Sequence, residues 1–475
     1  MNARVPKLAI VPAIAILASC AINPVTGEPE LALVSESQEI ALGRDAARDV
    51  RETIGLVDDE ALQRYVASVG QSLAGASERP DLPWEFHVVD DPTPNAFALP
   101  GGFIFLTRGL MSMMNSEAEL AAVLGHEIGH VTARHSVAQM SRAQLAQLGL
   151  QVGSIVSPEI AEIGDLASTG VGLLFLKYGR DDERQADELG FRYMLTQRYD
   201  VSEMADVFEA LAASGELAGR SSVPTWLASH PSEPDRIAAV RRRVDALDQA
   251  PADLRTNSAA YLERIDGLVY GDDPRAGYFA DGKFIHPDLD FQFDVPNEWQ
   301  KQNLRTAVRA VSPNQDAALM LTVEPGSPDE AAARLLSEDG IEPLGSDRSR
   351  INGQTAVISR FRAQAQGGTI EGLVAHIDAG AGSYRLVTYA MSSSFGSYGG
   401  LFEQIIDSFS GVTNADLVDV EVQRVQIVRL EQDMTLAEFA NRFPSGIPLE
   451  ELAVINQVSG ADSTLPAGTE VKRVV

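Results

Sequence analysis

The sequence predicts an α+β protein in three parts: a mainly helical domain with a small β-sheet over residues 20–268, an α+β domain over residues 275–412, and a small C-terminal module over residues 420–475. Three observations support this division. The 475 residues are too many for one ordinary domain. The first half is rich in runs with helical periodicity. After the linker-like segment GDDPRAG, strand-like runs alternate with turn residues.

The composition is that of an acidic globular protein. Hydrophobic residues make up 45% and charged residues 22% of the chain, which is typical of folded domains. The 67 acidic and 38 basic residues give a formal net charge of −29. Nucleic acid is itself strongly negative, so we exclude it as a partner.

The N-terminus has the features of a secretory signal. Arg4 and Lys7 precede an apolar run, residues 8–17, that is too short to span a membrane as a stable helix. The sequence Leu-Ala-Ser-Cys ends at Cys20, the only cysteine, and resembles a bacterial lipobox, whose cysteine is lipidated after cleavage. We predict a lipoprotein signal peptide over residues 1–19 and a lipid anchor at Cys20. The alternative is an ordinary signal peptide followed by a coincidental cysteine.

Hydrophobic periodicity indicates the elements of the first half. In order, it predicts helical runs within residues 36–75, strands over 84–90 and 103–107, and helices over 116–148, 181–197, 202–214 and 234–248. The turn Pro100-Gly101-Gly102 precedes the second strand. Ser116 and Glu119 form a capping-box pair that begins the long helix.

The segment HEIGHVTARH, residues 126–135, carries a metal-binding pattern. On a helix, His126 and His130 lie about 40° and one turn apart, so both imidazoles can share one zinc ion. Glu127, between them, can face a water molecule at the metal. On the same continuous helix His135 lies about 180° from His126 and points away.

The surroundings of this pattern favour a metal site over two solvated histidines. The helix LAAVLGHEIGHV is apolar on nearly every side, which predicts that it is buried. Buried ionisable groups need partners. Gly125 and Gly129 lower helix propensity without a local gain, so we predict that another element approaches the helix closely there.

A third ligand must come from elsewhere in the chain, and a carboxylate commonly completes such a site. The best candidate lies in the segment YGRDDERQADELG. Glu183 and Asp187 are four residues apart on a predicted helix, so both face the same way. Glu183 is the expected ligand, and Asp187 can accept a hydrogen bond from a ligand histidine. Taken alone, this segment would be a solvated charged helix.

Together these motifs resemble metallopeptidase family 48, a family of gluzincins. The resemblance rests on His126-Glu127-Ile128-Gly129-His130 followed by Glu183-x-x-Ala186-Asp187, and it covers residues 20 to about 268. Three further motifs resemble the bacterial lipoprotein branch: Asn23-Pro24-Val25-Thr26-Gly27, Asn95-Ala96-Phe97-Ala98-Leu99-Pro100-Gly101-Gly102, and Ser229-His230-Pro231 with Arg236. The prenyl proteases of the family carry transmembrane helices, and none is predicted here, which argues against a prenylated peptide substrate.

The resemblance implies a zinc peptidase with one Zn²⁺ per chain. His126, His130 and Glu183 would bind the ion, and Glu127 would take a proton from the attacking water. His230 would either stabilise the oxyanion or bind the zinc in a closed resting form. Asp187 and Arg236 would support the ligands from behind. The substrate peptide would lie along an edge strand that includes Gly101, Gly102, Phe103, Ile104 and Phe105.

The remaining parts of the chain carry weaker signals. Between residues 284 and 412, strand-like runs are interrupted by helical runs at 328–337 and 398–408, without a catalytic pattern. Residues 429–475 resemble a LysM module, a binder of N-acetylglucosamine polymers. The alternative is a small αβ domain without a ligand.

We therefore expect a zinc metalloendopeptidase of the bacterial envelope, in protein quality control or outer-membrane protein turnover. Expected partners are unfolded or misassembled envelope proteins as substrates, the outer membrane through the lipid anchor, and peptidoglycan. Ala21, in the position where Asp retains lipoproteins at the inner membrane, favours a periplasmic location at the outer membrane of a Gram-negative bacterium. The alternatives are an envelope chaperone or scaffold with little proteolysis, and a peptidoglycan-binding structural lipoprotein.

Overall fold

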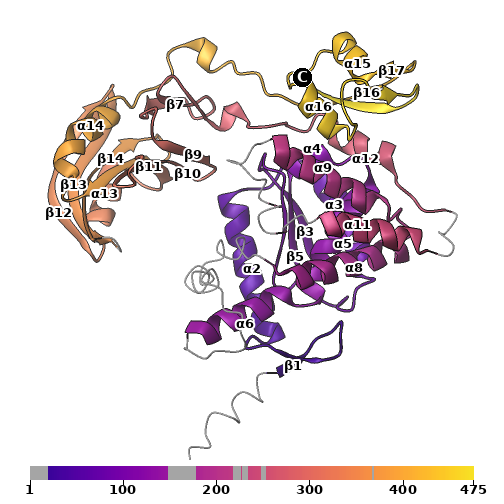
Figure 1. Ribbon diagram of the computed structural model, residues 1–475. Helices are drawn as coiled ribbons and strands as arrows, with labels where there is room; N and C mark the ends of the chain where they lie inside the picture. The colour runs from indigo at the N-terminus through magenta and orange to yellow at the C-terminus, as the bar shows by residue number, and fades with distance from the viewer. Residues whose placement is uncertain are drawn as a thin grey trace, which may run out of the picture. The chain divides into compact units, whose positions relative to one another are not determined.

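The computed structural model describes residues 20–147, 178–217, 226, 230, 234–247, 253–365 and 368–475. They form helices and sheets, which confirms the predicted α+β class (Figure 1). The chain divides into two compact units: residues 1–271 with 423–475, and residues 272–422. The predicted signal peptide lies outside the described residues. Within the described ranges, we find no helix with the length and apolar character needed to cross a membrane.

The first unit contains the helices and strands that build the site. Before the C-terminal module they are β1 (Cys20–Ile22), β2 (Pro29–Leu31), α2 (Glu36–Thr53), α3 (Glu60–Ala74), β3 (Glu85–Val89), β4 (Ala96–Leu99), β5 (Phe103–Thr107), α4 (Arg108–Met113), α5 (Glu117–Thr132), α6 (His135–Gln147), α8 (Arg180–Thr196), α9 (Glu203–Leu217), α11 (Pro234–Asp245) and α12 (Ser258–Ile265). Side-chain caps begin several of these helices. Ser35 and Gln38 form a capping box at α2, and Ser116 accepts from the backbone N–H of Glu119 at α5.

The small sheet has the strand order β3-β5-β4. β5 pairs in parallel with β3 on one side and antiparallel with β4 on the other. The prediction of an edge strand at Gly101, Gly102, Phe103, Ile104 and Phe105 is therefore wrong. The glycines form the turn from β4 into β5, and both have positive φ angles. The next three residues are fully buried in a strand with a partner on each side, and in the described chain β3 and β4 are the edges.

The metal-motif helix α5 packs closely against α8, as its glycines predict (Figure 1). A Cβ atom on Gly125 would lie 3.1 Å from Cα of Gly190, and one on Gly129 would lie 3.0 Å from Cα of Ala186. Larger residues would push the two helices apart, because the neighbouring atoms are backbone. The two glycines thus allow the face of α5 that carries the histidines to approach α8.

The prediction of one continuous helix over residues 116–148 is wrong. α5 ends at Thr132, and α6 begins at His135. Arg134 between them has a φ angle of 60°, a left-handed conformation that stops an α-helix. Arg134 is held there by bonds to Glu39 Oε2 (3.0 Å) and the carbonyl oxygen of Val34 (3.0 Å). This break changes the direction of His135.

The C-terminal module packs onto the same unit. It contains β16 (Val425–Arg429), β17 (Met434–Thr435), α15 (Leu436–Arg442), α16 (Leu449–Ile455), β18 (Thr464–Leu465) and β19 (Glu470–Val474). Nζ of the buried Lys472 donates to the carbonyl oxygens of Ser112 (2.8 Å) and Met114 (3.0 Å), and Gln457 donates to Glu119 (2.7 Å). The module therefore touches the start of α5, and its existence as a separate domain over residues 420–475 remains a prediction.

The second unit is built on an antiparallel sheet with the strand order β12-β13-β14-β15-β11-β10-β9, beside a smaller sheet, β6-β7-β8. Phe402, Ile405 and Ile406 of α14 belong to its hydrophobic core. Its elements are β6 (Tyr278–Ala280), β7 (Lys283–His286), β8 (Phe291–Asp294), β9 (Gln300–Leu304), β10 (Ala307–Val311), β11 (Ala317–Glu324), α13 (Pro328–Leu336), β12 (Ile341–Ile351), β13 (Gln354–Ala365), β14 (Gly368–Asp378), β15 (Ser383–Met391) and α14 (Phe395–Asp407).

Candidate metal centre

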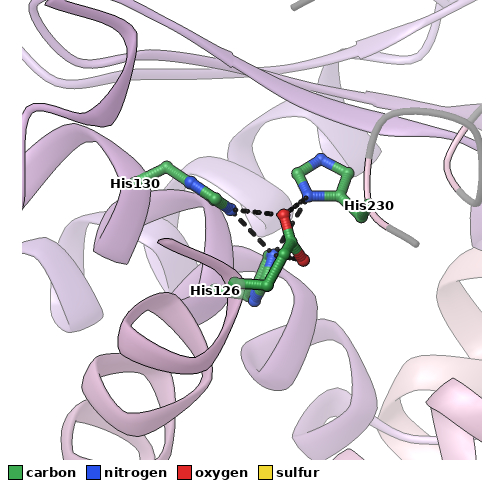
Figure 2. A group of neighbouring side chains, drawn as sticks. His126, His130 and His230 are labelled. Carbon is green, nitrogen blue, oxygen red and sulfur yellow. Dashed lines mark hydrogen bonds and ion pairs between the residues drawn. The ribbon is translucent and has the colours of Figure 1, made fainter. Parts of the chain in front are cut away.

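Four side chains from three regions of the chain meet in the interior of the first unit. His126 and His130 come from α5, Glu183 from α8, and His230 from the segment before α11. All four are buried, and their potential ligand atoms lie within 4.8 Å of one another. Figure 2 shows the three histidines turned toward a common point. The structure thus brings together the three predicted metal ligands and His230.

The spacing of these atoms fits a single metal ion. His126 Nε2 lies 3.0 Å from His130 Nε2 and 3.3 Å from His230 Nδ1. Glu183 Oε1 lies 2.9 Å from His230 Nδ1 and 3.5 Å from His130 Nε2. Zinc–ligand bonds of about 2.0–2.1 Å in a tetrahedron place neighbouring ligand atoms about 3.4 Å apart. The donor set, three imidazoles and one carboxylate, is also one that zinc prefers.

The protonation states of His130 and Glu183 suit metal binding. Burial lowers the pKa of His130 well below its usual value, so this imidazole is neutral near pH 7. Burial alone would raise the pKa of Glu183, but the charge of His230 and hydrogen bonds from His130 and His230 hold it well below its usual range. A neutral imidazole and an ionised carboxylate are the forms that bind a metal ion.

Glu127 lies beside this group, and its carboxylate accepts no hydrogen bond from the described residues. It is fully buried, and neither oxygen has a hydrogen-bond partner among the described residues. His230 Nε2 lies 3.5 Å from Glu127 Oε1, within ion-pair distance. A buried carboxylate without hydrogen bonds is costly, so its position next to the cluster is informative. Its oxygens are available to accept a proton at the site.

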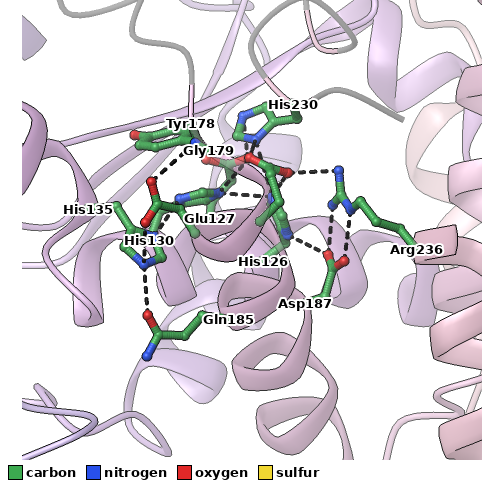
Figure 3. A network of polar contacts seen from close by, with 12 residues as sticks. His126, Glu127, His130, His135, Tyr178, Gly179, Gln185, Asp187, His230 and Arg236 are labelled. Atoms are coloured by element: carbon green, nitrogen blue, oxygen red, sulfur yellow. Dashed lines mark hydrogen bonds and ion pairs between the residues drawn. The ribbon is translucent and has the colours of Figure 1, made fainter. Parts of the chain in front are cut away.

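Asp187 and Arg236 support the group from behind, where the sequence predicts them (Figure 3). Asp187 Oδ1 lies 2.9 Å from His126 Nδ1, and the carboxylate accepts two bonds from Arg236, of 2.7 and 2.8 Å. Burial raises the pKa of Asp187, but the hydrogen bonds and charge of Arg236 outweigh it, so the pKa is lowered. Arg236 Nη1 also lies 2.7 Å from Glu183 Oε2. One arginine therefore contacts both the carboxylate of Glu183, a potential ligand, and Asp187, the partner of His126.

His135 is close to the site, contrary to the expectation that it points away. Its Nδ1 lies 2.9 Å from His130 Nδ1, and its Nε2 lies 2.9 Å from Gln185 Oε1. The ring of Tyr178 stacks on His130 at 3.8 Å. His135 is outside the group of potential ligands, but it contacts one from behind. No local pattern predicts this break in the helix, because Arg134 is neither Gly nor Asn, the usual residues at a helix-ending left-handed position.

Aromatic side chains pack against His230, and the sequence analysis did not predict them. The ring of Trp226 stacks on His230 at 5.1 Å, and Phe208 lies 5.5 Å from Trp226. The guanidinium of Arg236 lies over both aromatic rings, at 5.0 and 5.6 Å. Isolated aromatic residues are common in cores, so no local pattern could have assigned them to the site.

Comparison with known proteins agrees with this geometry. Residues 60–244 match the model of Peptidase family M48. Beta-barrel assembly-enhancing protease of Escherichia coli strain K12 is 27% identical over 282 residues, which cover 57% of this chain and 54% of that protein. The protein of that name from Yersinia pestis is 29% identical over 279 residues, 56% of this chain and 54% of that one.

A mitochondrial relative is also similar. Mitochondrial metalloendopeptidase OMA1 of Schizosaccharomyces pombe is 30% identical over 227 residues, covering 46% of this chain and 64% of that protein. The chain therefore spans about half to two thirds of the length of these curated relatives. The matched region contains the three predicted ligands, Glu127 and His230. Over residues 60–244, the chain carries a domain of Peptidase family M48.

Proposed function

We propose that the chain is a zinc-dependent metalloendopeptidase with one zinc ion per chain. The observation that carries the proposal is the convergence of four buried potential ligand atoms beside a buried carboxylate that has no hydrogen-bond partner among the described residues. His126, His130 and Glu183 would hold the ion, and Glu127 would serve catalysis. The experiment that tests the proposal is cleavage of an unfolded protein by the zinc-loaded chain.

In this mechanism the protein orients the groups and moves the proton. A bound zinc ion supplies Lewis-acid polarisation of a water molecule and of the scissile carbonyl. Glu127 accepts the proton of the attacking water and passes it to the leaving amine. Asp187 accepts the Nδ1–H of His126, which leaves Nε2 of that ring free to face the metal. Arg236 keeps the carboxylate of Asp187 ionised, and its contact with Glu183 Oε2 holds that carboxylate in place.

The substrate backbone is proposed to pair with β4. This strand is an edge of the small sheet, and it lies against α5, the helix that carries Glu127. An extended peptide can add to such an edge through main-chain hydrogen bonds. β4 thus takes the role that the sequence assigned to the following strand.

His230 is proposed to close the site in the arrangement described here. With four protein ligands a tetrahedral zinc ion has no open position, and open positions distinguish catalytic from structural zinc sites. The stacked Trp226 and the position of His230 Nδ1, 3.3 Å from His126 Nε2 and 2.9 Å from Glu183 Oε1, favour this closed arrangement. The competing role for His230 is stabilisation of the oxyanion during the reaction.

Replacing His230 with alanine separates these two roles. We expect His230→Ala to raise kcat/KM for an unfolded protein about tenfold, because a resting population that is about 90% closed would be released. His286→Ala, in the second unit, is the control and should leave the rate unchanged. If His230→Ala instead lowers the rate by about 10²–10³, His230 is an oxyanion stabiliser and the closed arrangement is not its function.

The cellular setting is proposed from the N-terminus and the relatives. Lipidation of Cys20 would tether the chain on the periplasmic side of the outer membrane of a Gram-negative bacterium. Relatives named beta-barrel assembly-enhancing protease support unfolded or misassembled outer-membrane proteins as substrates, in quality control or turnover. The C-terminal module, proposed to be LysM-like, would add contact with peptidoglycan.

A second candidate function is an envelope chaperone or scaffold with little proteolysis. The observation that favours it is the position of His230 Nδ1 close to His126 and Glu183, from which it would fill the fourth position around a bound ion. Proteolysis that stays negligible in both the wild-type chain and His230→Ala, with one zinc bound, would support this candidate over the peptidase.

A further inference from the structure

The contacts of His135 suggest a role that neither the motif spacing nor the comparisons assign. A histidine that binds a metal through Nε2 must carry its proton on Nδ1, and that N–H needs an acceptor. His126 has a carboxylate acceptor in Asp187. For His130 the atom in that position is Nδ1 of His135, at 2.9 Å. The acceptor is thus itself an imidazole, which must present a lone pair rather than a proton.

Gln185 favours the tautomer of His135 that has this lone pair on Nδ1. Its Oε1 lies 2.9 Å from His135 Nε2 and accepts a hydrogen bond from it. A neutral imidazole has one N–H, so a proton on Nε2 leaves Nδ1 of His135 as an acceptor. That acceptor takes the Nδ1–H of His130, and the lone pair of His130 Nε2 then faces the metal position. The hydrogen bonds from Gln185 through His135 to His130 therefore determine which nitrogen of each imidazole carries the proton.

The fold holds the two imidazole rings of His130 and His135 in a fixed position that is buried from solvent. His130 is 1% and His135 is 3% exposed, so bulk water does not compete for their Nδ1 atoms. The left-handed Arg134 ends α5 and begins α6 one turn beyond His130, which brings His135 behind that ring. Asn23 Nδ2 donates to the carbonyl oxygen of Ala133 (3.3 Å), and Glu39 binds Arg134. The break in the helix is thus secured on both sides.

We propose that His135 is a positioning residue for the metal ligand His130, and that Gln185 sets its tautomer. The proposal rests on the proposed function, since it requires a metal at His130. It differs from a packing role, because packing needs only the shape of the ring, whereas positioning needs an acceptor at the place of Nδ1. Asp182 does not substitute for Gln185, because its Oδ1 lies 3.8 Å from His135 Nε2, beyond hydrogen-bond distance.

Two substitutions of His135 distinguish the effect of the shape of its ring from the effect of its hydrogen bond to His130. His135→Phe keeps an aromatic ring beside Tyr178 and removes both nitrogens. His135→Asn loses the ring but places a carbonyl oxygen close to the position of Nδ1, where it can accept from His130. Positioning predicts that His135→Phe weakens zinc binding about 10–100-fold, the usual effect of losing such a partner, and that His135→Asn restores it to within about threefold of wild type.

The measurement is the zinc Kd of the full chain, by competition with a chromophoric chelator, together with the visible absorption of the Co²⁺-loaded protein. His135→Phe should shift the Co²⁺ absorption and raise the zinc Kd, while the melting temperature of the metal-free protein stays near that of wild type. Gln185→Leu should raise the zinc Kd in the same direction, and Gln185→Glu, which keeps an acceptor, should not. The exposed Glu188→Gln on the same helix is the control.

The proposal is overturned if zinc affinity ranks the two His135 variants in the opposite order. If His135→Phe binds zinc as tightly as wild type while His135→Asn does not, the ring serves packing alone. If both variants bind as tightly as wild type, His135 has no influence on the metal. In either case zinc binding and cleavage by the wild-type chain leave the proposed function standing. A wild-type chain that binds no zinc overturns both.

Discussion

Glu127→Gln is expected to abolish peptide cleavage while the fold and the zinc content stay unchanged. Glutamine keeps the size and shape of the side chain, but its amide cannot accept the proton of the attacking water. Loss of general acid–base catalysis typically lowers a rate by about 10²–10⁴. Because Glu127 contributes no ligand atom to the four-residue metal group, bound zinc should remain at one ion per chain.

The measurement compares kcat/KM for an unfolded reporter protein with zinc content by mass spectrometry in the same preparation. Glu188→Gln is the matched control, because it makes the same chemical change at an exposed position of α8 and should cleave like wild type. Cleavage by pure Glu127→Gln protein at the wild-type rate contradicts the mechanism, since another group must then carry the proton.

Glu183→Ala is expected to remove the zinc. The substitution deletes the anionic ligand and leaves the Arg236 guanidinium, whose Nη1 lies 2.7 Å from Glu183 Oε2, without that counter-charge. A cation facing the metal position repels the ion, so the loss should exceed the effect of removing a supporting residue, which is about 10–100-fold in affinity. Cleavage should fall with the zinc content.

Zinc content after dialysis against a weak chelator checks this result, and Glu188→Ala, on the exposed side of α8, is the control. One zinc ion retained per chain in Glu183→Ala means that the carboxylate is not required as a ligand. His230 would then be the replacement to examine, because its Nδ1 lies 3.3 Å from His126 Nε2. Loss of zinc from the control variant would show that α8 tolerates no substitution there.

Much of the site could be predicted because its chemistry depends on local spacing. His126 and His130 are one helical turn apart, and Glu183 and Asp187 likewise, so each pair shares a face wherever its helix lies. The glycines also predict that another element approaches α5 closely, because Gly125 has no other local advantage, and the structure identifies that element as α8. The structure bears out each of these geometric expectations.

The predictions that are wrong concern features that depend on distant parts of the chain. Whether the strand over residues 103–107 is central or an edge depends on its partners, and its own apolar pattern is compatible with both. The break at Arg134 is stabilised by Glu39 and Val34, about a hundred residues earlier, so no nearby residue signals it. That break turned His135 from a residue expected to point away into one that contacts His130.

The most direct test of the zinc-peptidase assignment is a titration of the metal-free full chain with Zn²⁺. Bound zinc and the rate of cleavage of an unfolded protein are measured in the same samples. We expect both to rise together and to saturate at one zinc ion per chain. Cleavage by the metal-free chain, or full zinc occupancy of His126, His130 and Glu183 without any cleavage, would contradict the assignment.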